Sequence, residues 1–164
     1  MKIAIISDTH DNTYNLRKTL AYIKERGVAV LLHAGDMTKA ETLELIGNSF
    51  HGDIYVVGGN ADLNNLEEVA KQYPLMNFGL DTLEVTLGSI KIAITHKPID
   101  AKTLANSGKY NLVIHGHDHK PWQKIINNTE LLNPGNVSDV RYPATFAIYD
   151  TETRKPSLVQ LARI

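Results

Sequence analysis

The sequence predicts an α/β (α+β) fold, a four-layer αββα sandwich of two packed mixed β-sheets flanked by helices. In the first 60 residues, short apolar runs alternate with segments of helical periodicity, a pattern typical of a parallel sheet with right-handed crossovers. In the remainder, apolar runs are joined by short turns, which indicates antiparallel pairing. Two packed sheets with helices outside accommodate both halves. We therefore expect residues 1–164 to form a single domain.

The three strands predicted in the first half are short apolar runs. Residues 2–7 hold a continuous apolar run, which is typical of a strand covered on both faces. Residues 28–33 are a second run of this kind, and residues 53–57 are a third, which Gly58 and Gly59 close. Because helical segments separate the runs, we expect parallel neighbours in one sheet.

Two helices are predicted between these strands. The first is capped by Asn12 or Thr13, has apolar residues at spacings of three and four, and ends at Gly27. The second opens at residue 38 or 39 and stops near Gly47. We expect both helices to pack on the outside of the sheet.

The second half is predicted to contain hairpins and two short helices. One helix spans residues 63–73 and is stopped by Pro74, and the other covers residues 101–106. Gly88-Ser89 and Asn127-Asn128 are the expected turns of two hairpins. Strands are expected at residues 82–87, 90–95, 112–115, 124–126, 130–132, 144–149 and 157–161.

The composition is ordinary for a globular protein and argues against several functions. Hydrophobic residues make up 43% and charged residues 21% of the chain. The net charge is −1 and no run of Lys and Arg reaches three, so we expect no broad nucleic-acid surface and no membrane surface. Cysteine is absent, which rules out disulfides and thiolate metal ligands. Without a secretory signal pattern or a span-length apolar stretch, the default is a cytoplasmic protein, and a homo-oligomer stays open.

Polar clusters follow five of the predicted strands. Each offers an oxygen or imidazole ligand, and the clusters are Asp8-Thr9-His10, Gly35-Asp36, Gly59-Asn60-Ala61-Asp62, Thr95-His96 and Gly116-His117-Asp118-His119. In open α/β sheets, ligands bind beyond the carboxyl ends of the strands. The sequence therefore predicts that seven side chains meet at one sheet edge: Asp8, His10, Asp36, Asn60, His96, His117 and His119.

This ligand set combines carboxylate, amide and imidazole groups without sulfur. It suits manganese, our first expectation, or nickel, cobalt, iron or zinc with open positions, rather than a closed thiolate zinc site or an all-oxygen calcium site. Two divalent ions, the carboxylates of Asp8 and Asp36 and a bridging hydroxide would leave about one positive charge, the right sign for a phosphoester. We expect two ions whose bridging hydroxide attacks phosphorus in line.

Each motif alone is a weak signal, because Asp-x-His and Gly-Asp occur in many unrelated proteins. The alternative interpretation makes the clusters independent turn and capping residues, and Asp8 and Asp36 would then cap helices. That alternative leaves the four histidines of the clusters unexplained. The order of the five clusters is therefore more specific than any one of them.

In this order, the clusters resemble the calcineurin-like metallophosphoesterase superfamily, and the resemblance covers the whole chain. The length and residues 133–138 are similar to the small bacterial and archaeal YfcE-type phosphodiesterases. The resemblance implies two packed sheets flanked by helices, and a small phosphoester as substrate. It implies that Asp8, His10 and His119 hold one metal ion, that Asn60, His96 and His117 hold the second, and that Asp36 bridges both. Asp36, Asn60 and His96 would also position the nucleophile and the phosphate.

The position after Asn60 departs from many members of the superfamily. Those members carry a histidine there that is thought to protonate the leaving group, whereas this chain has Ala61, similar to the small YfcE-like members. Without a strong acid, esters with acidic leaving groups should be cleaved best. We therefore expect a phosphodiesterase. The alternatives are a phosphomonoesterase or nucleotidase, and a non-catalytic scaffold like the related retromer subunit.

Five further residues could contact substrate or support a ligand. Lys97 could reach a phosphate, although a solvated loop lysine is favoured, and for Arg141 a surface salt bridge is favoured over substrate contact. Asp62 could orient a ligand or cap a helix. His115 is expected to be a hydrogen-bonded core residue rather than an eighth ligand. Asn12 could line the cleft or cap its helix.

Overall fold

The computed structural model describes residues 1–63 and 65–164, and the strands in these residues form two sheets. The first has the order β11-β10-β1-β2-β3-β4, with bounds Lys155–Gln160, Thr145–Asp150, Lys2–Ile6, Val30–His33, Asp53–Val57 and Met76–Gly79. The second has the order β5-β6-β7-β9-β8, with bounds Thr82–Leu87, Ile90–Thr95, Leu112–Ile114, Thr129–Asn133 and Trp122–Ile126. Both sheets mix parallel and antiparallel pairs, which confirms the predicted fold class.

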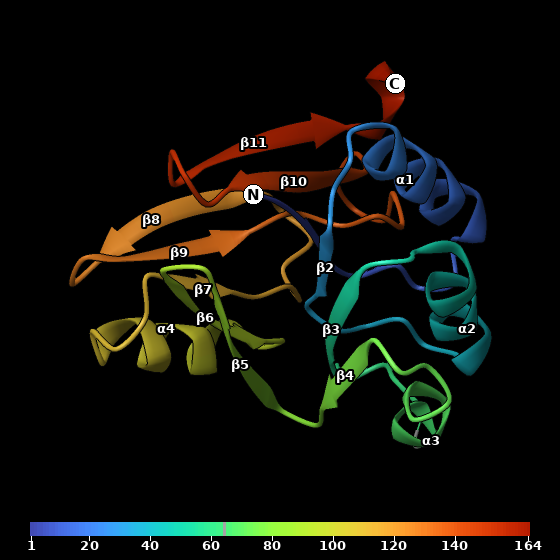
Figure 1. Ribbon diagram of the computed structural model, residues 1–164, viewed down its shortest axis with the longest axis horizontal. Helices are drawn as coiled ribbons and strands as arrows, with labels where there is room; N and C mark the ends of the chain where they lie inside the picture. Colours follow the sequence, from blue (N-terminus) through green and yellow to red (C-terminus); the bar gives the residue numbers. More distant parts are fainter. Residues whose placement is uncertain (64) are drawn as a thin grey trace.

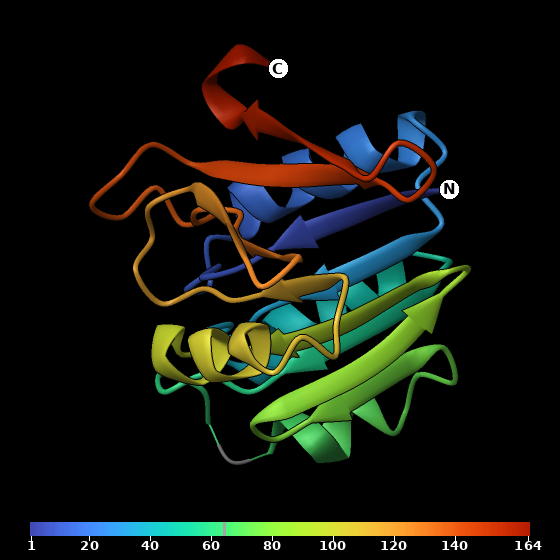
Figure 2. The same ribbon diagram turned by 90° about the vertical axis from the view of Figure 1, so that its left-hand side faces the viewer.

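The helices cover the outer faces of the two sheets (Figure 1). They are α1 (Thr13–Glu25), α2 (Ala40–Ser49), α3 (Leu66–Ala70) and α4 (Pro98–Asn106), and the 3-10 helix η1 (Leu161–Arg163) follows the last strand. In Figure 1 α4 lies on the left and α1 and α2 lie on the right, and in the view of Figure 2 α4 is in front of the sheets and α1 and α2 are behind them. The order of layers is therefore helix, sheet, sheet, helix.

Strand β1 shows why its sequence is a continuous apolar run. Ala4 and Ile6 belong to the core under α1 and α2, whereas Ile3 and Ile5 belong to the core between the two sheets. Successive side chains of a strand point to opposite faces, so a strand covered on both faces needs apolar residues throughout. A third, smaller core lies between the second sheet and α4, which contributes Ala101 and Ala105.

Three predicted helices differ in extent from those in the structure. The predicted helix 63–73 is reduced to Leu66–Ala70, and its residue 64 lies outside the described part of the chain. Helix α4 begins at Pro98 rather than residue 101, because proline is compatible with the first turn of a helix. Helix α2 continues through Gly47 to Ser49, because Thr42, Leu43 and Ile46 bury one side of it and outweigh the low helix propensity of glycine.

Strand β4 was not predicted at all. Its sequence Met-Asn-Phe-Gly lacks the β-branched residues and the length of a strand signal. It forms because β3 offers a free edge, against which residues 76–79 pair in parallel. Tertiary pairing therefore created an element that its own residues do not specify.

The parallel strands bring their carboxyl ends to one edge of the molecule. Strands β1, β2 and β3 run parallel in the first sheet, and β6 and β7 run parallel in the second. The five polar clusters follow these five strands. No helix in the described ranges is long and apolar enough to cross a membrane.

Candidate metal centre

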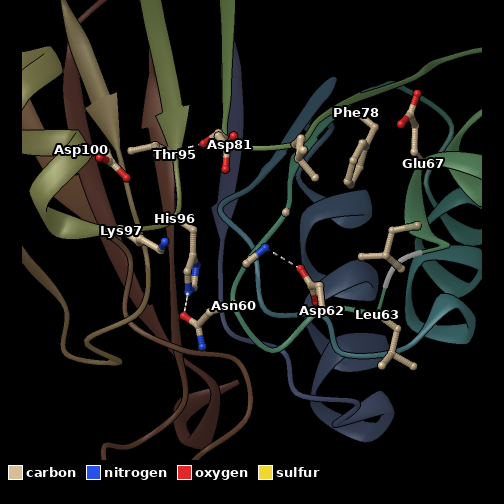
Figure 3. Close-up of a pocket in the computed structure, with 14 residues that line it drawn as sticks. Asn60, Asp62, Leu63, Glu67, Phe78, Asp81, Thr95, His96, Lys97 and Asp100 are labelled. Atoms are coloured by element: carbon tan, nitrogen blue, oxygen red, sulfur yellow. Dashed lines mark hydrogen bonds between the residues drawn. The ribbon is translucent and has the colours of Figure 1, made fainter.

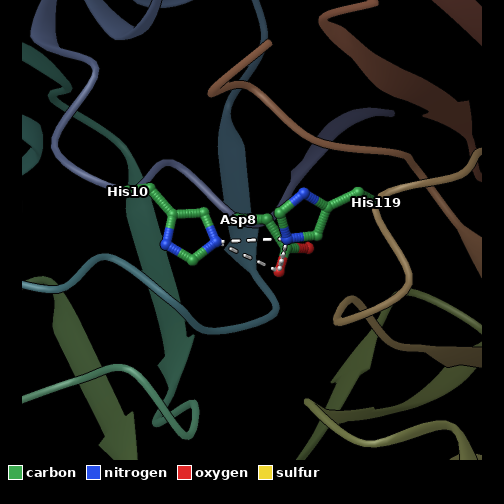
Figure 4. Close-up of side chains that lie close together, drawn as sticks. All are labelled: Asp8, His10 and His119. Atoms are coloured by element: carbon green, nitrogen blue, oxygen red, sulfur yellow. Dashed lines mark hydrogen bonds and ion pairs between the residues drawn. The ribbon is translucent and has the colours of Figure 1, made fainter. Parts of the chain in front are cut away.

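All seven predicted ligands come together at this edge, in two groups that share Asp36. In the first group, the Nε2 atoms of His10 and His119 face each other at 3.1 Å (Figure 4). The Oδ1 atom of Asp8 lies 3.4 Å from Nε2 of His119 and 4.0 Å from Nε2 of His10. Three donor atoms from the β1 and β7 loops therefore converge on one point.

The second group is built from the loops after β3, β6 and β7. The Oδ1 atom of Asn60 lies 3.1 Å from Nε2 of His96 and 2.9 Å from Nδ1 of His117. The two imidazole nitrogens are 3.3 Å apart. An amide oxygen and two imidazoles thus form a second set of converging donors.

The carboxylate of Asp36 lies between the two groups. Its Oδ2 atom is 3.7 Å from Nε2 of His10, and its Oδ1 atom is 3.4 Å from Nε2 of His96. Each oxygen therefore faces a different group, which is the arrangement that a bridging carboxylate requires.

The donor atoms fit divalent metal ions in kind and in spacing. Ligands about 2.1 Å from one ion lie about 3.0–3.4 Å from each other in octahedral or tetrahedral geometry. The separations of 3.1 Å between His10 and His119 and 3.3 Å between His96 and His117 fall in this range. Two imidazole nitrogens that face each other also need a shared proton or a cation between their lone pairs.

Two backbone carbonyls fix the orientation of two imidazoles. Nδ1 of His96 lies 2.8 Å from the carbonyl oxygen of Ala34, and Nδ1 of His119 lies 3.1 Å from that of Val140. A carbonyl oxygen can only accept, so each ring carries its proton on Nδ1 and donates it there. Each Nε2 atom then presents a lone pair to the centre, as metal ligation requires.

Five of the seven predicted ligands have a left-handed backbone conformation. The φ angles are 51° at Asp8, 39° at His10, 59° at Asp36, 72° at His117 and 60° at His119. Residues other than glycine rarely adopt this conformation, and it persists where the surrounding structure enforces it. These turns direct the side chains inward, and no local sequence signal predicts them.

Two glycines allow the loops to approach the carboxylates. A Cβ atom on Gly59 would overlap the side chain and backbone of Asp36, and one on Gly116 would overlap Ser7 and the carboxylate of Asp8. Gly35 has a φ of +92°, which favours glycine for conformational reasons, and a Cβ atom there would also overlap the ring of His96. Gly59 and Gly116 therefore provide space for the carboxylates, and Gly35 allows a left-handed turn.

Asp62 ties the Asp36 loop to the Asn60 loop. Its Oδ2 atom accepts from the backbone N–H groups of Gly59 at 2.7 Å and Asp36 at 3.1 Å, and its Oδ1 atom accepts from that of Thr38 at 2.6 Å. Helix α3 has Asn65 at its N-cap position instead. Of the two interpretations of Asp62, the structure favours support of a ligand loop.

A buried hydrogen-bond chain lies beneath the centre. Nδ1 of His33 accepts from the N–H of Gly35 at 3.1 Å, so its proton is on Nε2, 3.3 Å from the Thr9 hydroxyl. That hydroxyl donates to the carbonyl of Asp36 at 3.4 Å. Burial lowers the pKa of His33 to about 3. The ring is therefore neutral, as its hydrogen bonds to Gly35 and Thr9 require.

Asn136 is a supporting residue for which sequence reasoning gave no role. Its amide nitrogen donates to the carbonyls of His119 and Tyr142, and its amide oxygen accepts from the Ser138 hydroxyl and the Val140 N–H. The side chain is fully buried and makes four hydrogen bonds. It therefore holds the loop that carries His119 against the segment that follows β9.

Charge interactions set the protonation of the carboxylates. Burial would raise the pKa of Asp36, but the contact with His96, the hydrogen bond from the Ala61 N–H and the nearby imidazoles lower it to about 2. Burial is the largest effect on Asp8 and raises its pKa. Burial would lower the pKa of His96, yet its contact with Asp36 raises it. Protons and metal ions therefore compete for these groups.

The remaining predicted residues take different positions. Asn12 caps α1 by accepting from the Asn15 N–H, and it also donates to the carbonyl of Ser138. His115 is buried, its Nδ1 lies 2.9 Å from the Gly116 carbonyl, and burial lowers its pKa. The ring of His115 packs on Trp122.

Arg141 and Lys97 lie beside the centre. Arg141 lines a cavity of about 520 Å³ together with His10, Asp36, Asn60, Ala61, His117, His119 and Val140. Among the described residues it forms no ion pair, so the favoured surface salt bridge is not seen. Lys97 is exposed in the loop after His96, as expected of a solvated lysine, and lines a neighbouring cavity.

Comparison with known proteins identifies the family of this chain. Residues 1–154 match the model of the calcineurin-like phosphoesterase superfamily domain. The chain is 29% identical over 160 residues to a phosphodiesterase of Methanocaldococcus jannaschii, covering 94% of this chain and 96% of that protein. A solved structure of an archaeal phosphodiesterase shows 28% identity and a TM-score of 0.90, covering 98% of this chain and 99% of the other. The phosphoesterase YfcE of E. coli, 19% identical, shares the fold with a TM-score of 0.73 over 98% of this chain and all of the other.

Proposed function

This chain belongs to the calcineurin-like phosphoesterase superfamily, and from this premise we propose that it is a metal-dependent phosphodiesterase. It is accordingly a hydrolase of phosphoester bonds that depends on divalent metal ions. The relatives described as phosphodiesterases support the assignment of diesters as substrates. The core shared by the two sheets also supports the proposal that residues 1–164 form one domain.

We propose that the centre holds two divalent ions, with manganese as the preferred metal. Asp8, His10 and His119 would hold one, Asn60, His96 and His117 the other, and Asp36 both. The observation that carries this assignment is that the two oxygens of Asp36 face different ligand groups. When bound, such ions lower the pKa of water and neutralise charge on a phosphate, and the protein groups hold the water and the phosphate in line.

The side chains that line the 520 Å³ cavity determine which esters are cleaved best. Ala61 lies beside Asn60 and offers a methyl group where a proton donor for the leaving alcohol would stand. Arg141 on the same wall is positively charged and can attract a phosphate without releasing a proton. Diesters with acidic, aryl-type alcohols are therefore the favoured substrates, since their leaving groups need no protonation.

The test combines metal analysis with a substrate panel. Purified protein is expected to bind two ions per chain and, with manganese, to hydrolyse a bis-aryl diester faster than the matching aryl monoester. Nickel, cobalt, zinc and iron serve as comparison metals. A clear preference for the monoester would contradict the diesterase assignment. Two bound ions without hydrolysis of any phosphoester would favour the scaffold alternative.

A further inference from the structure

A second cavity opens beside the candidate metal centre (Figure 3). Its volume is about 240 Å³, and Asn60 and His96 form part of its wall. Asn60 also lines the 520 Å³ cavity that Arg141 borders, so the two cavities meet at a proposed metal ligand. A phosphodiester carries two alcohol arms on one phosphorus. A phosphate held at the centre can therefore direct one arm into each cavity.

The walls of the second cavity combine apolar and acidic side chains. Leu63, Leu66, Phe78 and Leu80 provide apolar surface, whereas Asp62, Glu67, Asp81 and Asp100 are acidic and Lys97 is the basic residue. Two of the acids are engaged: Asp62 accepts three backbone N–H groups, and Glu67 pairs with Lys71 at 2.8 Å.

Asp81 and Asp100 are the acids left to interact with a ligand. Within the described part of the chain, their carboxylates accept no hydrogen bond and form no ion pair. Asp81 lies between β4 and β5, and Asp100 lies in the first turn of α4, so the two acids come from different elements. Figure 3 shows Asp100 and Phe78 on opposite sides of the space, with Asp81 between them.

We propose that this cavity is a substrate subsite for a phosphodiester arm that carries a positively charged amino group. The proposal rests on the phosphodiesterase function proposed above. The ammonium would pair with Asp81 and Asp100, and the ring of Phe78 adds a surface that attracts cations. The volume accommodates about eight water-sized groups, which fits a short amino alcohol. Such a diester places its negative phosphate on the metal side and its positive end on the acidic side.

The test uses two diesters that differ in the retained arm alone. Both carry the same aryl leaving group; one has a 2-aminoethyl arm and the other a propyl arm of equal length. Water adds to phosphorus and the bond from phosphorus to the aryl oxygen breaks. The products are the aryloxide and an alkyl phosphate, and one proton of the water passes to the solvent. The ratio of kcat/KM for the aminoethyl ester to that for the propyl ester reports the subsite, independently of overall turnover.

We expect this ratio to be about five in the wild type, which corresponds to the contribution of one partly screened ion pair. The ratio should decrease at high ionic strength. The double variant Asp81→Asn, Asp100→Asn should bring it close to one. Asp53→Asn, an exposed aspartate at the start of β3, is the matched control and should keep the wild-type ratio.

The outcomes separate the subsite from the function on which it rests. Turnover of both esters at equal rates in the wild type, or a ratio that the double variant does not lower, would overturn the subsite alone. Loss of turnover on both esters and on a bis-aryl diester would overturn the phosphodiesterase assignment and the subsite with it.

Discussion

Asp36 keeps its two oxygens in separate directions because neighbours hold both its side chain and its backbone. The N–H of Ala61 donates to Oδ1 at 2.9 Å, and the carboxylate of Asp62 accepts from the backbone N–H of Asp36. With its pKa at about 2, the carboxylate stays charged throughout the neutral range. A single residue thus combines fixed orientation with permanent charge, and both are needed to bridge two cations.

The neighbouring Ala61 provides a test of the leaving-group argument. In Ala61→His, the imidazole would enter the 520 Å³ cavity and could protonate a poor leaving group. We expect the ratio of kcat/KM for an alkyl monoester to kcat/KM for an aryl diester to rise about tenfold. Ala61→Phe supplies similar bulk without a proton donor. An equal rise in both variants would assign the effect to shape rather than to acid catalysis.

At the scale of elements, the loops that carry the ligands are held in place by hydrogen bonds to other loops as well as by the strands that they follow. The segment after β9 donates from the N–H groups of Val137 and Ser138 to the carbonyls of Ser7 and Asp8. Asn136, in the same segment, binds the carbonyl of His119. One segment therefore sets the separation between the loop after β1 and the loop after β7.

Removal of this link should weaken metal binding. Asn136→Ala would leave the His119 carbonyl and the Val140 N–H without their buried partner, and we expect metal affinity to fall by about 10- to 100-fold. Calorimetric titration with manganese measures the change, with the exposed Asn77→Ala as control. Unaltered affinity in a folded Asn136→Ala protein would show that the segment does not position the ligands.

The limit of sequence-based prediction is visible at this scale. The ligands were predictable because each stands next to an apolar run, and both the run and its end are local features. Asp62 was expected either to orient a ligand or to cap a helix, and only its contacts across the fold decide between the two. His33 and Asn136 support the site through Thr9 and His119, which are 24 and 17 positions away, and no local pattern records such contacts. Strand β4 likewise depends on the free edge of β3. Support of the site therefore had to be read from the structure.

At the scale of the whole molecule, buried His33 links folding to pH. The pKa of His33 is about 3 in the folded protein, whereas an unfolded histidine titrates near pH 6.5. Below pH 6.5 the imidazole of His33 binds a proton in the unfolded protein but stays neutral in the folded protein. The stability that neutral His33 contributes is therefore complete above pH 6.5 and is lost as the pH falls towards 3, by about 1.4 kcal/mol per pH unit.

This dependence can be isolated by comparing the wild type with His33→Asn as metal-free proteins. At pH 7 the variant should be less stable, because it loses part of a buried hydrogen-bond chain. Between pH 6.5 and 4 the difference in unfolding free energy should narrow, as measured by urea denaturation. A difference that stays constant over this range would show that His33 is protonated in the folded state.

The placement of β10 has a consequence for synthesis on the ribosome. Strand β1 lies between β2 and β10, so its pairing edge is closed by residues 145–150, which are made far later. At about 5–20 residues per second, β1 waits roughly 7–30 seconds for that partner. During this interval the nascent chain exposes an apolar strand edge and unassembled ligand loops. A delay of this kind favours protection of the emerging chain by chaperones until translation ends.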